Sequence, residues 1–151
     1  MLVESEFTVP ASGAEVWAYL LEVEKVARCL PGAELTEVVD ASTYKGRIKV
    51  KLGAMDLSFS GTVNVVEMDD AEGRAVMKAS GREEKGKGQA QATVTAHLTE
   101  NGSGGTTIRI SQDIQMSGAV AQFGRGLIQD VAGSMIGKFA DCLKAELSRG
   151  R

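Results

Sequence analysis

The stretch GAVAQFGRGLIQDVAGSMIGKFADCLKAEL at residues 118–147 decides how this chain must be arranged. Its apolar side chains recur at steps of three and four residues, as on one face of an amphipathic helix: Val120, Phe123, Leu127, Ile128, Val131, Met135, Ile136, Phe139, Leu143 and Leu147. Such a helix is about 45 Å long, and we expect Ser117 to cap its first turn. A stripe of this length needs a large covering surface, and the segments before it predict a sheet.

Four glycines lie inside the predicted helix: Gly124, Gly126, Gly133 and Gly137. Each destabilises a helix by about 1 kcal/mol relative to alanine, whereas burial of the apolar stripe contributes roughly 15–30 kcal/mol, so the helix is still expected. On a helical wheel Gly124 falls within the stripe, and the other three cluster away from it. We interpret Gly124 as room for a ligand and the others as a smooth patch for a helix or lipid; a general richness in glycine is the alternative.

Length and composition predict one soluble domain, residues 1–151, that buries about 68–70% of the surface of its unfolded chain. Hydrophobic residues make up 43% and charged residues 25% of the chain, which is ordinary for a globular protein. The net charge of −3 gives no support to nucleic-acid binding. With 18 glycines and only 5% aromatic residues, the chain has few large side chains to fill its interior.

The chain has two cysteines, Cys29 and Cys142, far apart in the sequence. A disulfide is possible, but we expect two reduced, buried thiols. The N-terminal segment MLVESEFTVP lacks the charged and apolar regions of a signal peptide. No apolar run approaches the ~18 residues of a membrane-spanning helix, so a cytosolic protein is expected.

The first third of the chain predicts a strand and two short helices. Residues 3–9 alternate between apolar and polar side chains, which indicates a half-exposed strand. Ser12 and Glu15 form a capping box before the apolar face of a first helix, which consists of Val16, Trp17, Leu20 and Leu21. A second helix over Val23–Leu30 ends at Pro31-Gly32, which cannot continue it.

From Leu35 the hydrophobic period changes to two and predicts six further strands, separated by turns such as residues 69–73 and 101–105. Each long strand has one apolar and one polar face, as in an antiparallel sheet covered on one side. The chain is therefore expected to form one α+β domain, with a strand, two short helices, six strands and a long helix.

Small side chains occupy the inward phase of these strands: Gly46, Gly61, Ala75, Ala79, Ala90, Ala92 and Ala96. Protein interiors are normally close-packed, and a void lowers stability. We therefore interpret the small residues as lining a cavity for an apolar ligand. The alternative is a tightly curved sheet that brings its helix close.

Two polar residues also fall on the inward phase, Gln112 and Tyr44. A buried amide must be hydrogen-bonded, either to a carbonyl or hydroxyl of a ligand or to a neighbouring backbone group, and Tyr44 poses the same choice. Five methionines are adaptable enough to suit an apolar ligand or to fill an ordinary core: Met55, Met68, Met77, Met116 and Met135. The helix residues Leu127, Ile128 and Val131 face the same interior.

The charged residues do not predict a catalytic site. Lys45, Arg47, Lys49 and Lys51 align along one strand face, where an anionic membrane or an acidic protein could bind, or where they are simply solvated. His97 lies on a polar strand phase, and no cluster has the spacing of metal ligands. The adjacent Glu83 and Glu84 form at most a weak acid–base pair in an exposed loop, so nothing in the sequence requires an enzyme.

Three separated motifs carry a family resemblance. They are VW at 16–17 with VARCLPG at 26–32, YKGRIKVKLG at 44–53 with FSG at 59–61, and AQFG at 121–124. Together they resemble the CoxG family of carbon monoxide dehydrogenase subunits, part of the START-like (SRPBCC) superfamily, over Phe7 to about Leu147. The resemblance implies a helix-grip, Bet v 1-like fold, in which a curved seven-stranded antiparallel sheet wraps a long C-terminal helix around an apolar cavity.

The same resemblance implies a function. Proteins of this family accompany molybdenum-containing hydroxylases of the carbon monoxide dehydrogenase type and link them to the cytoplasmic membrane, so a peripheral position at its inner face is expected. The cavity would hold an isoprenoid quinone or another apolar lipid, with no covalent cofactor and no catalytic role. The resemblance places seven residues at the cavity or its mouth: Trp17, Pro31, Gly32, Phe59, Gln122, Phe123 and Gly124.

Two alternatives remain open at this point. The protein could be an adaptor whose surface docks the enzyme to the membrane while the cavity is incidental. It could also be a cyclase or hydrolase, as found elsewhere in the superfamily, which would need polar groups converging inside the cavity. Related sequences often continue into a proline-rich, apolar tail, and the sequence here ends at Arg151. Membrane contact is therefore expected either from such a tail or from the domain itself.

Overall fold

Seven strands form one antiparallel sheet in the order β1-β7-β6-β5-β4-β3-β2. The computed structural model describes residues 1–149, so the last two residues of the predicted domain lie outside it. The elements are β1 (Leu2–Val9), α1 (Gly13–Leu21), α2 (Val23–Cys29), β2 (Ala33–Asp40), β3 (Thr43–Leu52), β4 (Met55–Asp69), β5 (Arg74–Glu83), β6 (Gln89–Glu100), β7 (Thr106–Ser117), the 3₁₀ turn η1 (Ala119–Gln122) and α3 (Arg125–Arg149). The predicted order of elements and the α+β helix-grip architecture are confirmed.

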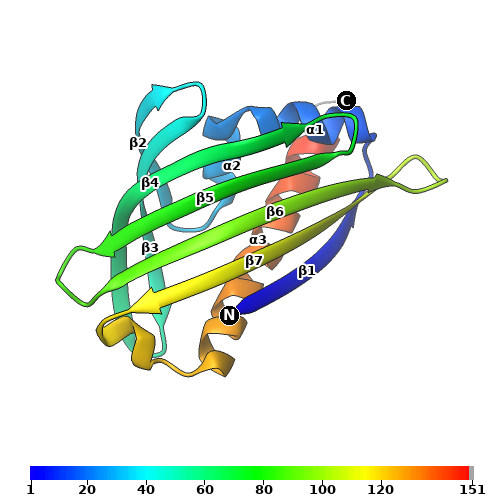
Figure 1. Ribbon diagram of the computed structural model, residues 1–151. Helices are drawn as coiled ribbons and strands as arrows, with labels where there is room; N and C mark the ends of the chain where they lie inside the picture. The colour runs from blue at the N-terminus through cyan, green and yellow to red at the C-terminus, as the bar shows by residue number, and fades with distance from the viewer. Residues whose placement is uncertain (150–151) are drawn as a thin grey trace.

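The long helix α3 runs diagonally across one face of the sheet, while α1 and α2 lie near its C-terminal end (Figure 1). It makes its main contacts with β1, β3 and α2. Because β1 is an edge strand and β3 lies next to the other edge, the helix bridges the two sides of the curved sheet. The central strands β4–β6 lie between these two points of support.

The first helix begins as its sequence predicts. The Ser12 hydroxyl accepts a hydrogen bond from the backbone N–H of Glu15 at 3.2 Å, and the Glu15 carboxylate accepts one from the backbone N–H of Ser12 at 3.3 Å. This reciprocal pair satisfies two backbone donors that a helix start leaves unpaired. The second helix ends at Cys29, just before Pro31, also as predicted.

The prediction of one continuous helix from residue 118 is wrong at its start. Strand β7 extends to Ser117, so this residue ends a strand instead of capping a helix. Gly118 has φ +79°, and Phe123 is extended with ψ 135°, so η1 is separated from α3. The α-helix begins only at Arg125. Glycines 124 and 126 favour a break here because each weakens a helix that would otherwise continue.

Sheet curvature explains two of the small inward residues. A Cβ atom added to Gly61 would lie 1.8 Å from the backbone oxygen of Ser80, and one added to Gly46 would lie 2.7 Å from the backbone oxygen of Glu34. Gly46 and Gly61 are also register partners. Neighbouring strands therefore approach too closely for side chains here, and the assignment of these two glycines to ligand space was wrong.

The core consists of two separate clusters. The helix-end cluster joins α1, α2 and the C-terminal half of α3 to β1 and β7 and includes Val9, Val16, Ile108, Phe139 and Leu143. The mouth-end cluster joins β3, β4, η1 and the start of α3 and includes Leu52, Leu57, Phe59 and Val120. Most inward residues in the middle of the sheet belong to neither cluster.

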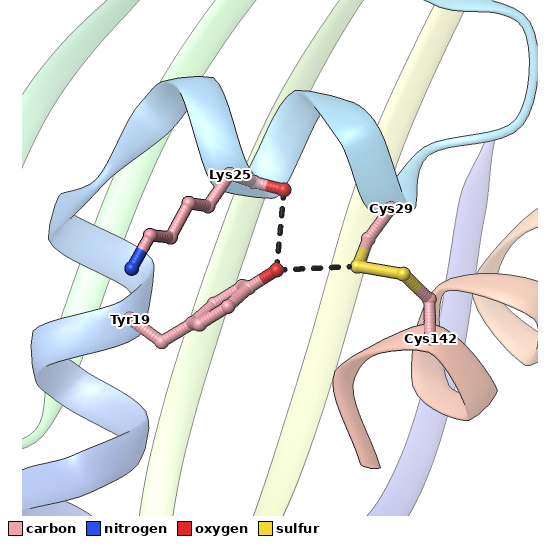
Figure 2. Close-up of a disulfide and its surroundings, with 4 residues drawn as sticks. All are labelled: Tyr19, Lys25, Cys29 and Cys142. Carbon is pink, nitrogen blue, oxygen red and sulfur yellow. Dashed lines mark hydrogen bonds between the residues drawn. A yellow bond between two sulfur atoms is a disulfide. The ribbon is translucent and has the colours of Figure 1, made fainter. Parts of the chain in front are cut away.

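Cys29 and Cys142 form a disulfide between α2 and α3, and the expectation of two reduced thiols was therefore wrong. The Tyr19 hydroxyl lies 3.3 Å from the Cys29 sulfur and donates a hydrogen bond to the Lys25 backbone oxygen at 3.2 Å (Figure 2). Burial, and secondarily the nearby Glu146 carboxylate, raises the pKa of Tyr19. The phenol thus stays a neutral donor beside the disulfide.

Candidate ligand-binding site

Between the two clusters, the sheet presents apolar side chains that face α3 but are only half-buried. The inward phase is set by Ile108 and Ile110, which pack in the helix-end cluster with residues of α3. On the same phase of the central strands lie Val63, Val65, Met77, Ala79, Ala92, Gln112 and Ile114, all half-buried. We call these seven residues the central concave surface. An interior face that stays accessible in this way can receive an apolar ligand.

The central concave surface consists of two adjacent rows of cross-strand partners. One row runs through Val63, Ala79, Ala92 and Ile114, and the other through Val65, Met77 and Gln112. Val94 lies between Met77 and Gln112 in the second row, but it packs against the helix-end cluster and is not one of the seven. The shortest side chains of the surface lie in the first row, where Ala79 and Ala92 are register partners. Three of its members were predicted as ligand-binding residues: Met77, Ala92 and Gln112.

Gln112 is the polar member of this surface. Its Nε2 atom is buried, and no hydrogen-bond partner for it occurs among residues 1–149. Its partners in the neighbouring strands are Val3 and Val94, which offer no side-chain acceptor. The sequence left two possible partners for this amide, a ligand or a neighbouring backbone group. The structure shows no backbone group of the described residues bonded to Nε2.

Tyr44, the other polar residue predicted to face inward, is the register partner of Val63. Unlike Gln112 Nε2, its hydroxyl has a hydrogen-bond partner within the chain. Its hydroxyl donates a hydrogen bond of 2.9 Å to the backbone oxygen of Ala41, in the turn between β2 and β3. This local bond satisfies the hydroxyl at the edge of the site. Tyr44 can therefore contribute its ring to a ligand without needing the ligand as an acceptor.

A pocket of about 400 Å³ opens at the end of the sheet where β3 turns into β4. We call it the mouth pocket, and its lining residues are Met55, Leu57, Lys87, Ala119, Val120, Gln122 and Phe123. Its volume is within the range of small-molecule sites. The predicted mouth residues Gln122 and Phe123 therefore do lie together, on the irregular segment between β7 and α3.

The other predicted site residues are distributed around these two features. Five of them pack in or against the core: Phe59 is a buried member of the mouth-end cluster, Ala90, Leu127 and Val131 are partly buried against that cluster, and Leu20 is partly buried against the helix-end cluster. Trp17 and Ile128 are buried, and Met135 is half-buried on α3. A Cβ atom at Gly124 would meet no atom of the described residues within 4 Å, but Gly124 precedes α3 and is not part of its stripe.

Pro31 and Gly32 form the turn between α2 and β2. Gly32 has φ +77°, and a Cβ atom there would lie 2.4 Å from the backbone oxygen of Lys49. This close approach fixes the path from α2 into β2 and requires glycine whether or not a ligand is present.

Sequence reasoning did not select several lining residues. Val63, Val65 and Ile114 complete the central concave surface, and Lys87, Val120 and Leu57 line the mouth pocket. The alternation of strands β4 and β7 placed Val63, Val65 and Ile114 inward, but nothing local distinguished them from fully packed neighbours. Lys87 could not be found in this way, because a loop brings it to the pocket.

A further hollow of about 460 Å³ lies on the outside, between α2 and the edge strand β2. Its lining includes charged residues from both elements: Glu24, Arg28, Glu34 and Glu37. Such a lining suits an apolar ligand poorly. The candidate site is therefore the central concave surface with the mouth pocket.

Residues 5–148 match the model of a family of carbon monoxide dehydrogenase subunits, CoxG. This chain belongs to the CoxG family. The match covers both parts of the candidate site and all elements except the first three residues of β1 and the last residue of α3. A search of curated proteins found no significant match for the CoxG-family chain.

Solved structures share the fold of this CoxG-family protein at low sequence identity. A conserved protein from Geobacillus kaustophilus has a TM-score of 0.88 and 19% identity, covering 99% of this chain and 96% of that one. A START superfamily protein from Mycobacterium smegmatis has a TM-score of 0.69 and 13% identity, covering 99% of both chains. An aromatase/cyclase from Streptomyces has a TM-score of 0.71 and 15% identity, covering 99% of this chain and 94% of that one. These similarities establish a START-like fold.

Glu83 supports the loop beside the mouth pocket. It ends β5 and is buried, with 3% of its surface exposed, so its predicted position in an exposed loop was wrong. Its carboxylate accepts hydrogen bonds from the backbone N–H groups of Ser58 at 3.1 Å, Lys85 at 2.9 Å and Lys87 at 3.2 Å. These bonds, the one from Ser58 above all, hold the pKa of Glu83 below its usual range. The carboxylate thus organises the β5–β6 loop.

The basic run on the convex face of β3 is partly neutralised. Arg47 donates two hydrogen bonds of 2.9 Å to the Glu84 carboxylate, which also accepts one from Ser60. The Arg47 guanidinium, more than any other group, lowers the pKa of Glu84. Glu84 is therefore held as a carboxylate in an ion pair with Arg47. Lys45, Lys49 and Lys51 remain exposed, and no ion pair of theirs occurs within the described part of the chain.

Within residues 1–149, no helix of this CoxG-family protein is both long enough and apolar enough to span a bilayer.

Proposed function

We propose that this CoxG-family protein is a non-catalytic accessory to a molybdenum-containing hydroxylase of the carbon monoxide dehydrogenase type. It binds an isoprenoid quinone, or a similarly apolar lipid, on the central concave surface. The observation that carries the proposal is this half-buried apolar surface between two separately packed clusters. The family description, which names a subunit of carbon monoxide dehydrogenase, supports the choice of partner.

The shape of the site favours a flat or extended apolar ligand. Ala79 and Ala92 carry the shortest side chains of the surface, and Met77 beside them can adapt to an irregular ligand. Removing apolar surface from water contributes about 25 cal/mol per Å². This term keeps a quinone ring and part of its isoprenoid chain on the apolar surface and out of water, while the bilayer, which is equally apolar, can take the molecule back.

The mouth pocket supplies a route for such a ligand. Its floor consists of fully buried Leu57 and Val120, and Phe123 forms part of its wall. The segment from Gly118 to Gly124, which lines it, consists of the short 3₁₀ turn η1 between non-helical residues at Gly118 and Phe123. Movement of this segment would admit a lipid without disturbing the seven-stranded sheet. We place the protein at the inner face of the cytoplasmic membrane, where it exchanges the quinone between enzyme and bilayer.

An adaptor function is the second candidate, and the exposed Lys45, Lys49 and Lys51 favour it. Three cations on one strand face attract an anionic membrane surface, by about 1 kcal/mol per lysine. In this case the protein would recruit the enzyme to the membrane without carrying a ligand.

An enzymatic function has weaker support. A cyclase or hydrolase on this fold requires polar groups that converge on a substrate. In the described chain the central concave surface presents Gln112 as its polar side chain, and the Tyr44 hydroxyl is already bonded to Ala41. The similarity to an aromatase/cyclase extends to the fold alone.

Native mass spectrometry with organic extraction of protein purified from its own host tests the proposal. We expect one prenylated quinone or similar lipid per chain. The Ala92→Phe variant places a ring where the side chains of the surface are shortest and should lose the ligand while remaining folded. Its control, Gln91→Phe, adds the same ring to the exposed face of the same strand and should keep the ligand. A wild-type protein that is isolated without ligand and fails to bind added quinone would support the adaptor function instead.

A further inference from the structure

We infer that Gln112 orients the bound ligand by donating a hydrogen bond from Nε2 to an acceptor oxygen of that ligand. The central concave surface would therefore select apolar molecules that carry a carbonyl over hydrocarbons of the same shape. This inference rests on the proposed function, because it names the polar contact within the same site.

The first support is the state of the amide itself. Gln112 Nε2 is buried and has no hydrogen-bond partner among the described residues. A buried donor without a partner is unfavourable, and nearly all such groups in native proteins are paired with protein or with ordered water. Nε2 therefore has an unmet requirement for an acceptor, and it belongs to a half-buried residue of the surface where the ligand is proposed to lie.

The second support is the contrast along β7. The inward positions on either side of Gln112 are apolar: Ile108, Ile110, Ile114 and Met116. A leucine or methionine at position 112 would continue this pattern with no polar group to satisfy. A glutamine here gains nothing from the valines that flank it at positions 3 and 94, so its amide is explained by a partner outside the chain.

The third support is the position of the amide within the site. Gln112 lies on the same row as Met77 and diagonally across from Ala92, which is the register partner of Ile114. A ligand ring seated over the alanines therefore has its edge toward the amide. The Tyr44 hydroxyl at the far side of the sheet is already a donor to Ala41. Gln112 is thus the group that can fix which edge of a ring faces β7.

The test uses two probes of nearly the same shape, menadione and methylnaphthalene, which differ in the two carbonyl oxygens of the quinone. Dissociation constants for both are measured by calorimetry on the full chain. We divide the dissociation constant of menadione by that of methylnaphthalene. This ratio should be about five- to tenfold higher for Gln112→Leu than for wild type, because the variant loses one hydrogen bond to the carbonyl. The shift should arise from weaker menadione binding, with methylnaphthalene binding equally well or better.

Two further variants keep the test decisive. Gln112→Met replaces the amide with an unbranched apolar side chain, in case leucine disturbs the fold, and should give the same shift. Gln115→Leu removes an exposed amide from the outer face of the same strand and should leave the ratio unchanged. A purely structural role for Gln112 would weaken both probes together and leave their ratio constant.

The outcomes separate this inference from the proposed function. If both probes bind and Gln112→Leu leaves their ratio unchanged, the amide does not contact the ligand and the inference is overturned, while the proposed carrier function stands. If neither probe binds the wild-type chain, the inference is overturned, and the carrier function is then decided by whether protein purified from its own host carries a lipid. A shifted ratio in Gln112→Leu and Gln112→Met, but not in Gln115→Leu, establishes the contact.

Discussion

Cys29 of α2 and Cys142 of α3 are linked by a disulfide whose Cα atoms lie 5.4 Å apart, although 113 residues separate them in the sequence. The bond ties the C-terminal half of the long helix to the segment that leads into β2. It therefore holds the helix end of the fold while leaving the mouth at the opposite end, around Phe123, without a covalent tie.

Removing this disulfide should destabilise the protein. For the double variant Cys29→Ala, Cys142→Ala we expect the free energy of unfolding to fall by about 2–4 kcal/mol, because the bond closes a long loop in the unfolded chain. Urea unfolding without reductant measures the change. Because only 3% of Cys29 is exposed, the disulfide of the native wild-type protein should resist reductant. When the wild-type protein is denatured without reductant, it should show no reactive thiol. Two titrating thiols would contradict this assignment.

The two classes of glycine should respond oppositely to alanine. Gly61→Ala forces a Cβ atom to within 1.8 Å of the Ser80 backbone oxygen, so we expect a loss of about 3 kcal/mol or more, or failure to fold. Gly137→Ala is the matched variant on α3, where a Cβ meets no described atom within 4 Å. It should stabilise the protein by about 1 kcal/mol through higher helix propensity. Thermal and urea unfolding compare them, and equal effects would refute the curvature explanation.

Glu83 should make stability depend on pH at the acidic end. Its pKa in the folded protein is lowered, chiefly by the backbone N–H of Ser58, whereas an unfolded glutamate has a pKa of about 4.3. Its stabilising contribution is therefore fully present above that value and is lost as pH falls through the folded-state pKa. Glu83→Gln should be less stable than wild type at neutral pH, and the difference should shrink below about pH 4. A constant difference across that range would argue against the carboxylate as the cause.

The three exposed lysines of β3 should control binding to anionic vesicles. Replacing Lys45, Lys49 and Lys51 with alanine should lower partitioning onto phosphatidylglycerol vesicles about 100-fold at low salt, at about 1 kcal/mol per lysine. The control replaces Lys25, Lys138 and Lys144, which changes the net charge equally but lies on the helices. Vesicle sedimentation at two salt concentrations measures the effect. Equal losses in both variants would indicate that net charge, and not this face, governs binding.

The identity and order of the elements followed from local signals in the sequence. Alternation marked the strands, the capping box of Ser12 and Glu15 marked the start of α1, and Pro31 marked the end of α2. Each of these signals depends on residues within one turn or one strand, so it can be recognised without knowing the fold. The inward phase of Met77, Ala92 and Gln112 followed from the same alternation, and three motifs in order indicated the family.

Which inward residues pack and which remain accessible depends on the tertiary structure. Helical periodicity continues through Phe123, yet η1 turns away there so that Val120 can pack with Leu52 and Leu57 of the sheet. Gly61 was interpreted as space, but its position is filled by the backbone of the next strand. The pairing of Cys29 with Cys142 depends on how α2 meets α3. Periodicity records which face of an element is buried, whereas distances between remote segments follow from sheet curvature and the crossing of the long helix.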